Sequence, residues 1–298
     1  MNGIICIDKP QGFTSFDVIA KMRGISRQRK IGHSGTLDPM ATGVLPLLFG
    51  TATKACDIMP DTGKEYKAGF RLGVSTDTQD ITGTVLAEKP VHSLDIEDIK
   101  KAFSKFVGEI DQLPPMYSAV QVNGVRLYDL ARQGIEIERK SRKAVVDYIE
   151  VLSFDGVGGV IKIGCRKGTY VRTVIHDAGV LLKTGAVMTS LVRTGSGIFR
   201  LEDCITIDEA QRLADDGRLE SVLIPTDRAF TGFPEAVLSE KQARMYTCGV
   251  KLDTNRIRFK GEGELYRVYD SKGEFLAVGK ADFYKGELSI YKSFFGGK

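Results

Sequence analysis

The apolar positions at the start of the chain predict a strand followed by a helix. Residues 3–7 are almost continuously apolar, which is typical of a buried strand and too short for the core of a signal peptide. A turn over residues 8–14 follows, and Thr14 or Ser15 is placed to cap a helix that ends near Gly24. The face of this helix that we expect to pack inward carries Phe16, Ile19, Ala20 and Arg23.

Further segments show the periodicity of strands and helices. The strands that we expect cover residues 44–49, 66–72, 145–154 and 160–165. An amphipathic helix is expected over 95–107, where Gly108 stops it, and a second from Val171 to about Gly185. Thr206 and Glu209 form a capping box for a helix that runs to Gly217.

From about residue 233 the apolar runs become shorter and richer in residues that are typical of strands. Runs at 256–259, 265–269, 275–278 and 288–291 are separated by turns that contain glycine. This spacing predicts a small separate β domain. Pro225 and Pro234 lie near its boundary with the first part of the chain.

Residues 114–143 form a long segment that is polar, basic and only weakly periodic. It begins at Pro114-Pro115 and ends in a basic run, with one or two helical turns expected near 126–132. A long segment of this kind between structured elements is either functional or a surface excursion. The residues alone leave both readings open.

Composition and charge narrow the class of protein. The apolar fraction is 42%, and no apolar run is long enough to span a bilayer, so we expect a cytoplasmic globular protein. Five scattered cysteines and three histidines lack the spacing of a disulfide framework or a metal site, and no phosphate-binding loop is present. We therefore expect no metal, no nucleotide and no other cofactor. The net charge is only +4, but residues 21–30 carry five basic residues and no acid, which suits either a polyanion or a solvated face.

The stretch from Gly32 to Leu45 holds the candidate chemistry. It contains three glycines, His33 and Asp38, and Asp38 precedes a proline, which disfavours helical geometry at that residue. Its carboxylate should therefore be presented from a stiff loop, although such loops are turns more often than active sites. Arg172 lies in the first turn of an expected helix, where the helix dipole disfavours a cation, so we expect it to pair with a carboxylate.

These residues resemble the TruB family of tRNA pseudouridine synthases over nearly the whole chain. The stretch from Gly32 to Leu45 is similar to the family's signature, and the other motifs occur in the family's order. They are Lys9-Pro10-x-Gly12-x-x-Ser15, Lys64-Glu65-Tyr66, Arg71-Leu72-Gly73 with Thr76-Asp77-Thr78-x-Asp80, Gly168-Thr169-Tyr170-x-Arg172 and Leu191-x-Arg193. The segment from Leu265 to Ala281 is similar to a PUA domain.

The resemblance implies an α+β fold with a mixed, mostly antiparallel central sheet and flanking helices. It implies a catalytic domain at 1–230, with an RNA-binding insertion at about 114–143. A small β-barrel-like PUA domain would follow at 233–298. The implied reaction converts uridine 55, in the T loop of tRNA, to pseudouridine, and it uses no cofactor.

The resemblance also implies roles for individual residues. Asp38 matches the catalytic aspartate, and Arg172 matches an arginine that pairs with it and lowers its pKa. Asp80 matches a second carboxylate on that arginine. Tyr66 matches a tyrosine that stacks on the flipped base, Tyr170 and Leu191 would line the pocket, and His33 would help displace the uridine.

The implied partner is tRNA. The basic run with Arg27, Arg29 and Lys30 and the insertion with Arg126, Arg132 and Arg142 would bind the T arm, while the C-terminal domain would contact the acceptor stem. We expect a monomer. Two alternatives stay open. One is the catalytic subunit of a guide-RNA-dependent complex, whose archaeal and eukaryotic members lack the long insertion. The other is an RNA-binding protein that mainly folds tRNA, while an aspartate-dependent glycosidase is a more remote third.

Overall fold

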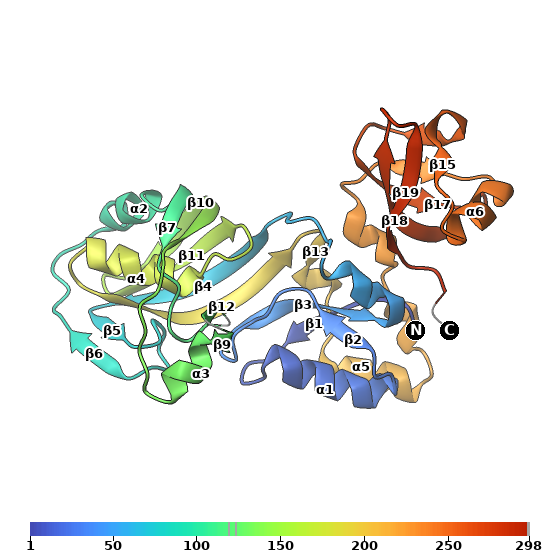
Figure 1. The fold of residues 1–298 in the computed structure, drawn as a ribbon. Coiled ribbons are helices and arrows are strands. Elements are labelled where there is room, and N and C mark those ends of the chain that lie inside the picture. Colours follow the sequence, from blue (N-terminus) through green and yellow to red (C-terminus); the bar gives the residue numbers. More distant parts are fainter. Residues whose placement is uncertain (119, 123, 297–298) are drawn as a thin grey trace.

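The computed structural model describes residues 1–118, 120–122 and 124–296. The four residues outside this description fall within the expected insertion (119 and 123) and at the end of the expected PUA domain (297 and 298). In the described part of the chain, no helix is long and apolar enough to cross a membrane. Figure 1 shows a large sheet with helices packed against it and a smaller β unit at one end.

The large sheet has nine strands, and most of its neighbours are antiparallel. Along its main path the order is β1 (Gly3–Lys9), β3 (Thr42–Phe49), β12 (Ala186–Ser196), β4 (Lys64–Leu72), β11 (Gly158–Cys165), β10 (Arg142–Phe154) and β7 (Gly108–Gln112). Two short strands pair off this path, β2 (Ile31–His33) with β3 and β13 (Phe199–Arg200) with β12. The pairing of β12 with β3 is parallel. The predicted mixed, mostly antiparallel sheet is therefore confirmed.

Strands β1 and β3 bury both of their faces, which explains their continuous apolar runs. On one face Ile5 and Ile7 pack against α1 (Ser15–Ser26) and α5 (Ile207–Asp215). On the other face Ile4 and Cys6 belong to a second cluster that includes Phe230. The strand and helices predicted from these runs are present.

The inward face predicted for α1 is wrong. Thr14 caps the helix in a capping box with Asp17, as expected, but the buried apolar residues are Val18, Ile19 and Met22. Phe16 is 67% exposed. The buried face also includes Ser15, which is bonded to Leu37, and Phe16 lies outside this face. The helix also continues past Gly24 to Ser26.

The other half of the large sheet carries α2 (Ile96–Ser104) and α4 (Val171–Leu181), both of which were predicted. Helix α4 packs on β12 and β4, and α2 packs on β10 and α4 (Figure 1). Phe70 and Phe103 meet edge-on in the core between these elements, with ring centroids 5.4 Å apart. Strand β12, at the centre of the sheet, was not predicted. Its polar residues interrupt the apolar pattern.

Smaller elements connect these parts. They are η1 (Gly50–Ala55), β5 (Val74–Thr76), β6 (Val85–Glu88), β8 (Gln121–Val122), β9 (Val125–Arg126), α3 (Leu127–Arg132), η2 (Leu201–Asp203), η3 (Leu219–Val222) and η4 (Thr226–Phe230). Strands β5 and β6 form one hairpin, and β8 and β9 form another within the expected insertion. The insertion therefore has structure of its own in its described part.

The C-terminal unit is a six-stranded sheet with one helix. Its strand order is β15 (Leu252–Asp253), β19 (Glu287–Ser293), β18 (Phe275–Asp282), β17 (Leu265–Tyr269), β14 (Glu235–Val237) and β16 (Arg258–Lys260). The four runs predicted from the pattern correspond to β16 to β19. Helix α6 (Glu240–Thr247), the turn η5 (Thr254–Arg256) and the short strands β14 and β15 were not predicted.

An aromatic cluster joins the C-terminal unit to the rest of the molecule. The Phe230 ring is fully buried and lies 6.2 Å from Phe275 and 5.7 Å from Phe294 between centroids. The cluster also includes Ile4 of β1. An ion pair between Lys292 and Asp57, at 2.7 Å, adds a polar contact at the edge.

Replacing Phe230 with alanine tests this contact. Phe230→Ala should lower the free energy of unfolding by about 3–5 kcal/mol, because it removes a fully buried ring and leaves a cavity. Urea denaturation would measure the change. The matched control is Phe16→Ala, at an exposed ring, which should stay within about 0.5 kcal/mol of the unaltered protein. Equal effects of the two changes would contradict the assigned burial.

Candidate active site

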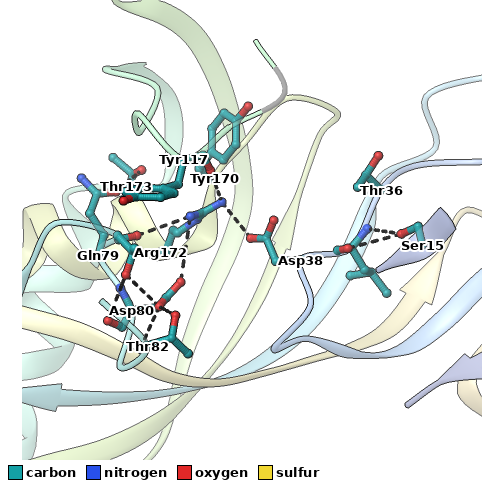
Figure 2. Close-up of polar contacts among 12 residues, drawn as sticks. Ser15, Thr36, Asp38, Gln79, Asp80, Thr82, Tyr117, Tyr170, Arg172 and Thr173 are labelled. Atoms are coloured by element: carbon teal, nitrogen blue, oxygen red, sulfur yellow. Dashed lines mark hydrogen bonds and ion pairs between the residues drawn. The ribbon is translucent and has the colours of Figure 1, made fainter. Parts of the chain in front are cut away.

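Asp38 lies in the loop 34–41, which joins β2 to β3 beside the centre of the large sheet. Ser15 of α1 fixes this loop through two hydrogen bonds with Leu37 (Figure 2). The Leu37 amide donates to Ser15 Oγ at 2.9 Å, and this hydroxyl donates to the Leu37 carbonyl at 3.3 Å. Asp38 itself belongs to neither helix nor strand, as its place before a proline predicts.

Two fully buried cations hold the backbone of this loop from either end. Lys9 Nζ donates to the Pro39 carbonyl at 3.3 Å and to the carbonyls of Pro10 and Phe13. Arg193 Nη2 donates to the Gly35 carbonyl at 3.1 Å, and its Nε donates to the Val44 carbonyl at 2.6 Å. Hydrogen bonds from charged donors are stronger than neutral ones. The loop therefore presents Asp38 from a rigid backbone.

Gly43 lets the strand that leaves this loop approach Arg193 closely. Its φ is +97°, and a Cβ at this position would lie 2.3 Å from the Arg193 carbonyl oxygen. A side chain would separate β3 from β12 at the point where the two strands pair in parallel. The glycine is thus required by packing as well as by its backbone angle.

Neither buried cation has a carboxylate within 4.0 Å among the described residues. Burial lowers the pKa of Lys9 to about 8, against an opposing effect of the Asp38 carboxylate. Backbone carbonyls are thus the partners of both charges. Lys9 and Arg193 stood in the recognised motifs, but their hold on the loop was not predicted.

Arg172 joins Asp38 to Asp80. Its Nη2 lies 2.8 Å from Asp38 Oδ2, and its Nη1 lies 3.9 Å from Asp80 Oδ2 (Figure 2). The Arg172 side chain is only 6% exposed, whereas that of Asp38 is 38% exposed. The carboxylate partner expected for a cation in the first turn of α4 is therefore present. Of the two carboxylates, it is Asp38 that opens to solvent.

Hydroxyl groups around Asp80 fix the second carboxylate. Asp80 Oδ1 accepts from Thr78 Oγ1 at 2.8 Å, from Thr82 Oγ1 at 2.6 Å and from the Thr82 amide at 3.0 Å. Next to it, Gln79 Oε1 accepts from Thr173 Oγ1 of α4 at 2.7 Å. The β5–β6 loop is thus tied to α4, and Asp80 is oriented toward the arginine without being open to a ligand.

Arg172 lowers the pKa of Asp38, as expected, but burial outweighs its effect. Burial raises the pKa of this carboxyl above its ordinary value of 3.8, and Arg172 opposes the rise without reversing it. Asp80 adds to the rise, and Lys9 opposes it. Pairing with an arginine lowers the pKa of a carboxyl, whereas the removal of water from a carboxylate raises it. The opening of the side chain to solvent limits the size of the rise.

Gln112 clamps the start of α4 and is a site residue that the sequence did not suggest. The Tyr170 amide donates to Gln112 Oε1 at 2.8 Å, and Gln112 Nε2 donates to the Tyr170 carbonyl at 3.1 Å. Gln112 is buried at the end of β7. Tyr170 precedes Arg172 by two residues, and its ring centroid is 5.9 Å from the Arg172 guanidinium carbon. The amide therefore positions the arginine through the backbone.

The insertion reaches the same arginine through its backbone. Arg172 Nη2 donates to the Tyr117 carbonyl at 2.9 Å. The Tyr128 amide, from α3, donates to the Ser118 carbonyl at 3.1 Å. The described base of the insertion is thus connected to the side chain that holds Asp38 (Figure 2). This contact was not predicted.

Tyr66 and Leu191 lie on adjacent central strands and share a core cluster with Leu37. Tyr66 of β4 stands opposite Arg193 of β12. Burial raises the pKa of the Tyr66 phenol, and the charge of Arg193 opposes this rise. Tyr66 and Leu191 are each more than nine-tenths buried. They therefore pack in the core next to Leu37 of the Asp38 loop.

The basic run before β2 lies at the far end of that strand from Asp38. Lys30 precedes Ile31, which pairs with Phe49, whereas His33 pairs with Leu47 next to the loop. His33 is half-buried, and burial followed by the charge of Arg193 lowers its pKa. The structure thus brings His33 toward the Asp38 loop. It leaves Arg27, Arg29 and Lys30 exposed about one strand length away.

The three arginines expected to bind RNA from the insertion are exposed. Arg126 and Arg132 both lie against the Tyr128 ring, with guanidinium carbons 5.9 Å and 5.5 Å from its centroid. Arg142 begins β10, opposite Gln112. The insertion thus presents cations and one aromatic ring on a short helix. These residues are separate from the Asp38 network.

The arrangement offers one oriented carboxylate that is open to a ligand and paired with a buried guanidinium. Among the described residues, no three His, Cys, Asp or Glu side chains lie together as ligands of a metal ion would. Such a carboxylate can stabilise a developing positive charge, attack an electrophilic carbon or remove a proton.

Comparison with known proteins identifies the family. Residues 23–171 match the model of the TruB family pseudouridylate synthase N-terminal domain, and residues 172–231 match the tRNA pseudouridylate synthase B C-terminal domain. Among curated relatives, the tRNA pseudouridine synthase B of Clostridium perfringens (strain 13 / Type A) is 42% identical over 95% of this chain and 96% of its own. That of Clostridioides difficile (strain 630) is 40% identical over 97% of this chain and 98% of its own.

A solved structure has the same fold. A chain in a crystal structure of a Cbf5–Nop10–Gar1 complex is 30% identical, with a TM-score of 0.75 over 98% of this chain and 84% of that one. The agreement extends across both units of the fold. The chain therefore belongs to the TruB family of pseudouridylate synthases, and it is an enzyme that isomerises uridine to pseudouridine.

Proposed function

We propose that this enzyme converts uridine 55, in the T loop of tRNA, to pseudouridine. The names of the relatives from Clostridium perfringens and Clostridioides difficile support tRNA as the substrate class. The observation that carries the assignment of Asp38 as the catalytic residue is its geometry. Its side chain is 38% exposed, and a buried arginine holds its carboxylate at 2.8 Å.

The reaction makes one demand on this carboxylate. The N1–C1′ bond breaks, the uracil turns, C5 bonds to C1′, the proton on C5 leaves and N1 gains one, so no atom is lost. Positive charge develops at C1′ when the first bond breaks, and a carboxylate beside that carbon stabilises it or bonds to it. Arg172 holds the Asp38 carboxylate at one oxygen, which leaves the other oxygen free for the sugar.

The target base must leave its stack to reach Asp38. Flipping costs a few kcal/mol, and contacts in the pocket offset that cost. We assign Tyr66 to stacking on the flipped base, Tyr170 and Leu191 to the pocket wall, and His33 to displacement of the uridine. Their support is the family resemblance together with their positions around the Asp38 loop.

The RNA is held by surfaces outside this pocket. We assign the insertion at about 114–143, with Arg126, Arg132 and Arg142, and the run with Arg27, Arg29 and Lys30, to the T arm. We assign residues 1–230 to a catalytic domain and 233–298 to a PUA-like domain that contacts the acceptor stem. Exposure of the six basic side chains supports the first assignment. We further propose a monomer that acts in the cytoplasm without a cofactor.

A guide-RNA-dependent subunit is the second candidate, because solved neighbours include a Cbf5 complex and an H/ACA RNP. Curated relatives named tRNA pseudouridine synthase B have higher identity and cover nearly the whole chain, which favours an enzyme that acts alone. The purified chain, mixed with unmodified tRNA and no guide RNA, should form pseudouridine at position 55 and at no other uridine. Product that requires a guide RNA would favour the alternative.

Asp38→Asn tests the catalytic residue. The variant should bind tRNA with unchanged affinity but turn over at least about 10³-fold more slowly, because an amide can neither attack C1′ nor accept a proton. Single-turnover assays and filter binding would separate the two effects. Retained turnover would exclude Asp38 as the catalytic residue. The tRNA-folding alternative would be favoured if the wild-type chain bound and refolded tRNA but formed no pseudouridine.

Removing the charge of Arg172 should change the pH dependence. Activity needs ionised Asp38, so it is present above the pKa of that carboxyl and lost as the pH falls through it. Arg172 opposes the rise of this pKa, so Arg172→Gln should move the acidic limb of kcat/KM up by about 1–3 pH units. Arg172→Lys keeps the charge but lacks the planar fork, so it should lower kcat with little shift of the limb. An acidic limb that stays in place in Arg172→Gln would contradict the ion pair's role.

The insertion is tested by a pair of matched double variants. Arg126→Ala with Arg132→Ala should weaken tRNA binding and reduce the slope of log K against log salt by about 0.7–0.9 for each lost phosphate contact. The control, Arg212→Ala with Arg218→Ala, removes one exposed arginine of α5 and one just before η3, and it should leave the slope unchanged. Equal slopes for the two double variants would show that the insertion does not bind phosphates.

A further inference from the structure

Lys64 lies beside the Asp38 loop and has no side-chain partner among the described residues. It is the first residue of β4, and its side chain is half-buried. Within the described residues it makes no ion pair and no side-chain hydrogen bond. Burial and then the charge of Arg193 lower its pKa. Such a position is unfavourable for a lysine unless an anion compensates it.

The backbone at Gly35 brings Lys64 and Arg193 together. A Cβ at Gly35 would lie 3.1 Å from Lys64 Nζ and 3.5 Å from Arg193 Nη1, and the φ of Gly35 is +84°. The loop that presents Asp38 thus passes directly over two positive charges. Gly35 lies three residues before Asp38, and this side of the loop faces the end of β2 that carries His33.

The carboxylates closest in sequence to Lys64 are engaged elsewhere. Asp61 accepts from the backbone amide of Lys167, at 3.0 Å for Oδ2. Glu65, the next residue, accepts from Tyr148 Oη at 2.6 Å and from Thr194 Oγ1 at 2.8 Å, and it pairs with Lys162. The positive charge near Gly35 therefore has no protein carboxylate at ion-pair distance among the described residues.

Unpartnered polar atoms adjoin the same point of the loop. His33 Nδ1 and Ser34 Oγ are buried and have no hydrogen-bond partner in the described part of the chain. Buried polar atoms are normally paired, so such orphans call for a missing partner. Arg193 supplies charge here more than contacts, because its nitrogens already donate to the carbonyls of Val44, Gly35 and Thr36.

We propose that Lys64, with Arg193 behind it, binds a backbone phosphate of the RNA next to the uridine held at Asp38. The ligand is a phosphodiester monoanion, which a lysine binds as a point charge. This inference rests on the proposed RNA substrate. It assigns a binding role to a residue distinct from those that act on the base and from the exposed arginines of the insertion.

The experiment measures binding of an RNA hairpin with the sequence of a tRNA T arm. All variants carry Asp38→Asn, so that no turnover occurs during the measurement. Lys64→Gln should reduce the slope of log K against log salt by about 0.7–0.9, the value for one phosphate contact. Lys64→Arg keeps the charge and should keep the slope. Lys67→Gln is the matched control, because Lys67 is exposed on the opposite face of the same strand.

Single methylphosphonate replacements in the hairpin locate the contact. Each replacement removes the charge of one phosphate. One position next to the target uridine should weaken binding with Lys64 present and have no further effect in Lys64→Gln, whereas other positions should weaken both equally. Additive effects at every position, or an unchanged salt slope in Lys64→Gln, would overturn the proposal.

Two controls keep the outcome interpretable. Circular dichroism and urea denaturation would show that Lys64→Gln is folded, and a misfolded variant would be replaced by Lys64→Met, which also removes the charge, with the same methylphosphonate hairpins. There, coupling at one phosphate still supports the contact, and its absence overturns it. Failure of the proposed function is seen separately, as an unaltered chain that forms no pseudouridine in the hairpin.

Discussion

The surrounding structure has to hold the ion pair between Asp38 and Arg172 and still leave Asp38 open. A guanidinium that is only 6% exposed needs acceptors for its N–H groups, and an aspartate that acts on a substrate has to keep one oxygen free. Asp80, the Thr78 carbonyl and the Tyr117 carbonyl supply further acceptors for Arg172. These groups come from the β5–β6 loop and the base of the insertion. The arginine thus joins segments that are far apart in sequence, and Asp38 is left open.

Much of the fold was predictable because its strands and helices bury long apolar runs. Strands β1 and β3 bury both faces and read as continuous apolar segments, while α2 and α4 show clear helical periodicity. Strand β12 was missed, although it is central. It carries a fully buried Arg193 whose partners are backbone carbonyls, and no residue pattern marks such a partner. The phase of α1 was wrong because the polar Ser15 belongs to its buried face, where its hydroxyl accepts from the Leu37 amide.

The candidate site also contains some residues that the sequence predicted and some that it did not. Asp38, Arg172 and Asp80 were predicted together from motifs, and the structure brings them into one network. Gln112 was missed because its amide contacts the backbone of Tyr170, and any residue there would offer the same groups. The lowering of the Asp38 pKa by Arg172 was expected, but the larger opposite effect of burial was not, because the sequence identifies a charge partner but not the water that folding removes. A contact between two side chains can be predicted from the residue types in the sequence. A contact to the backbone, or the loss of solvent on folding, cannot be predicted in this way.

The cations around the Asp38 loop oppose an electrostatic repulsion between the enzyme and its substrate. A polyanionic RNA repels the ionised carboxylate that has to approach its sugar, and the phosphates next to the target would raise the pKa of Asp38 further. Lys9 and Arg193 are fully buried without a carboxylate at ion-pair distance among the described residues, and Lys64 adds a third positive charge near Gly35. In the folded protein these cations are costly by themselves. The proposed phosphate contact at Lys64 would offset part of this cost and counter the repulsion between the RNA and the Asp38 carboxylate.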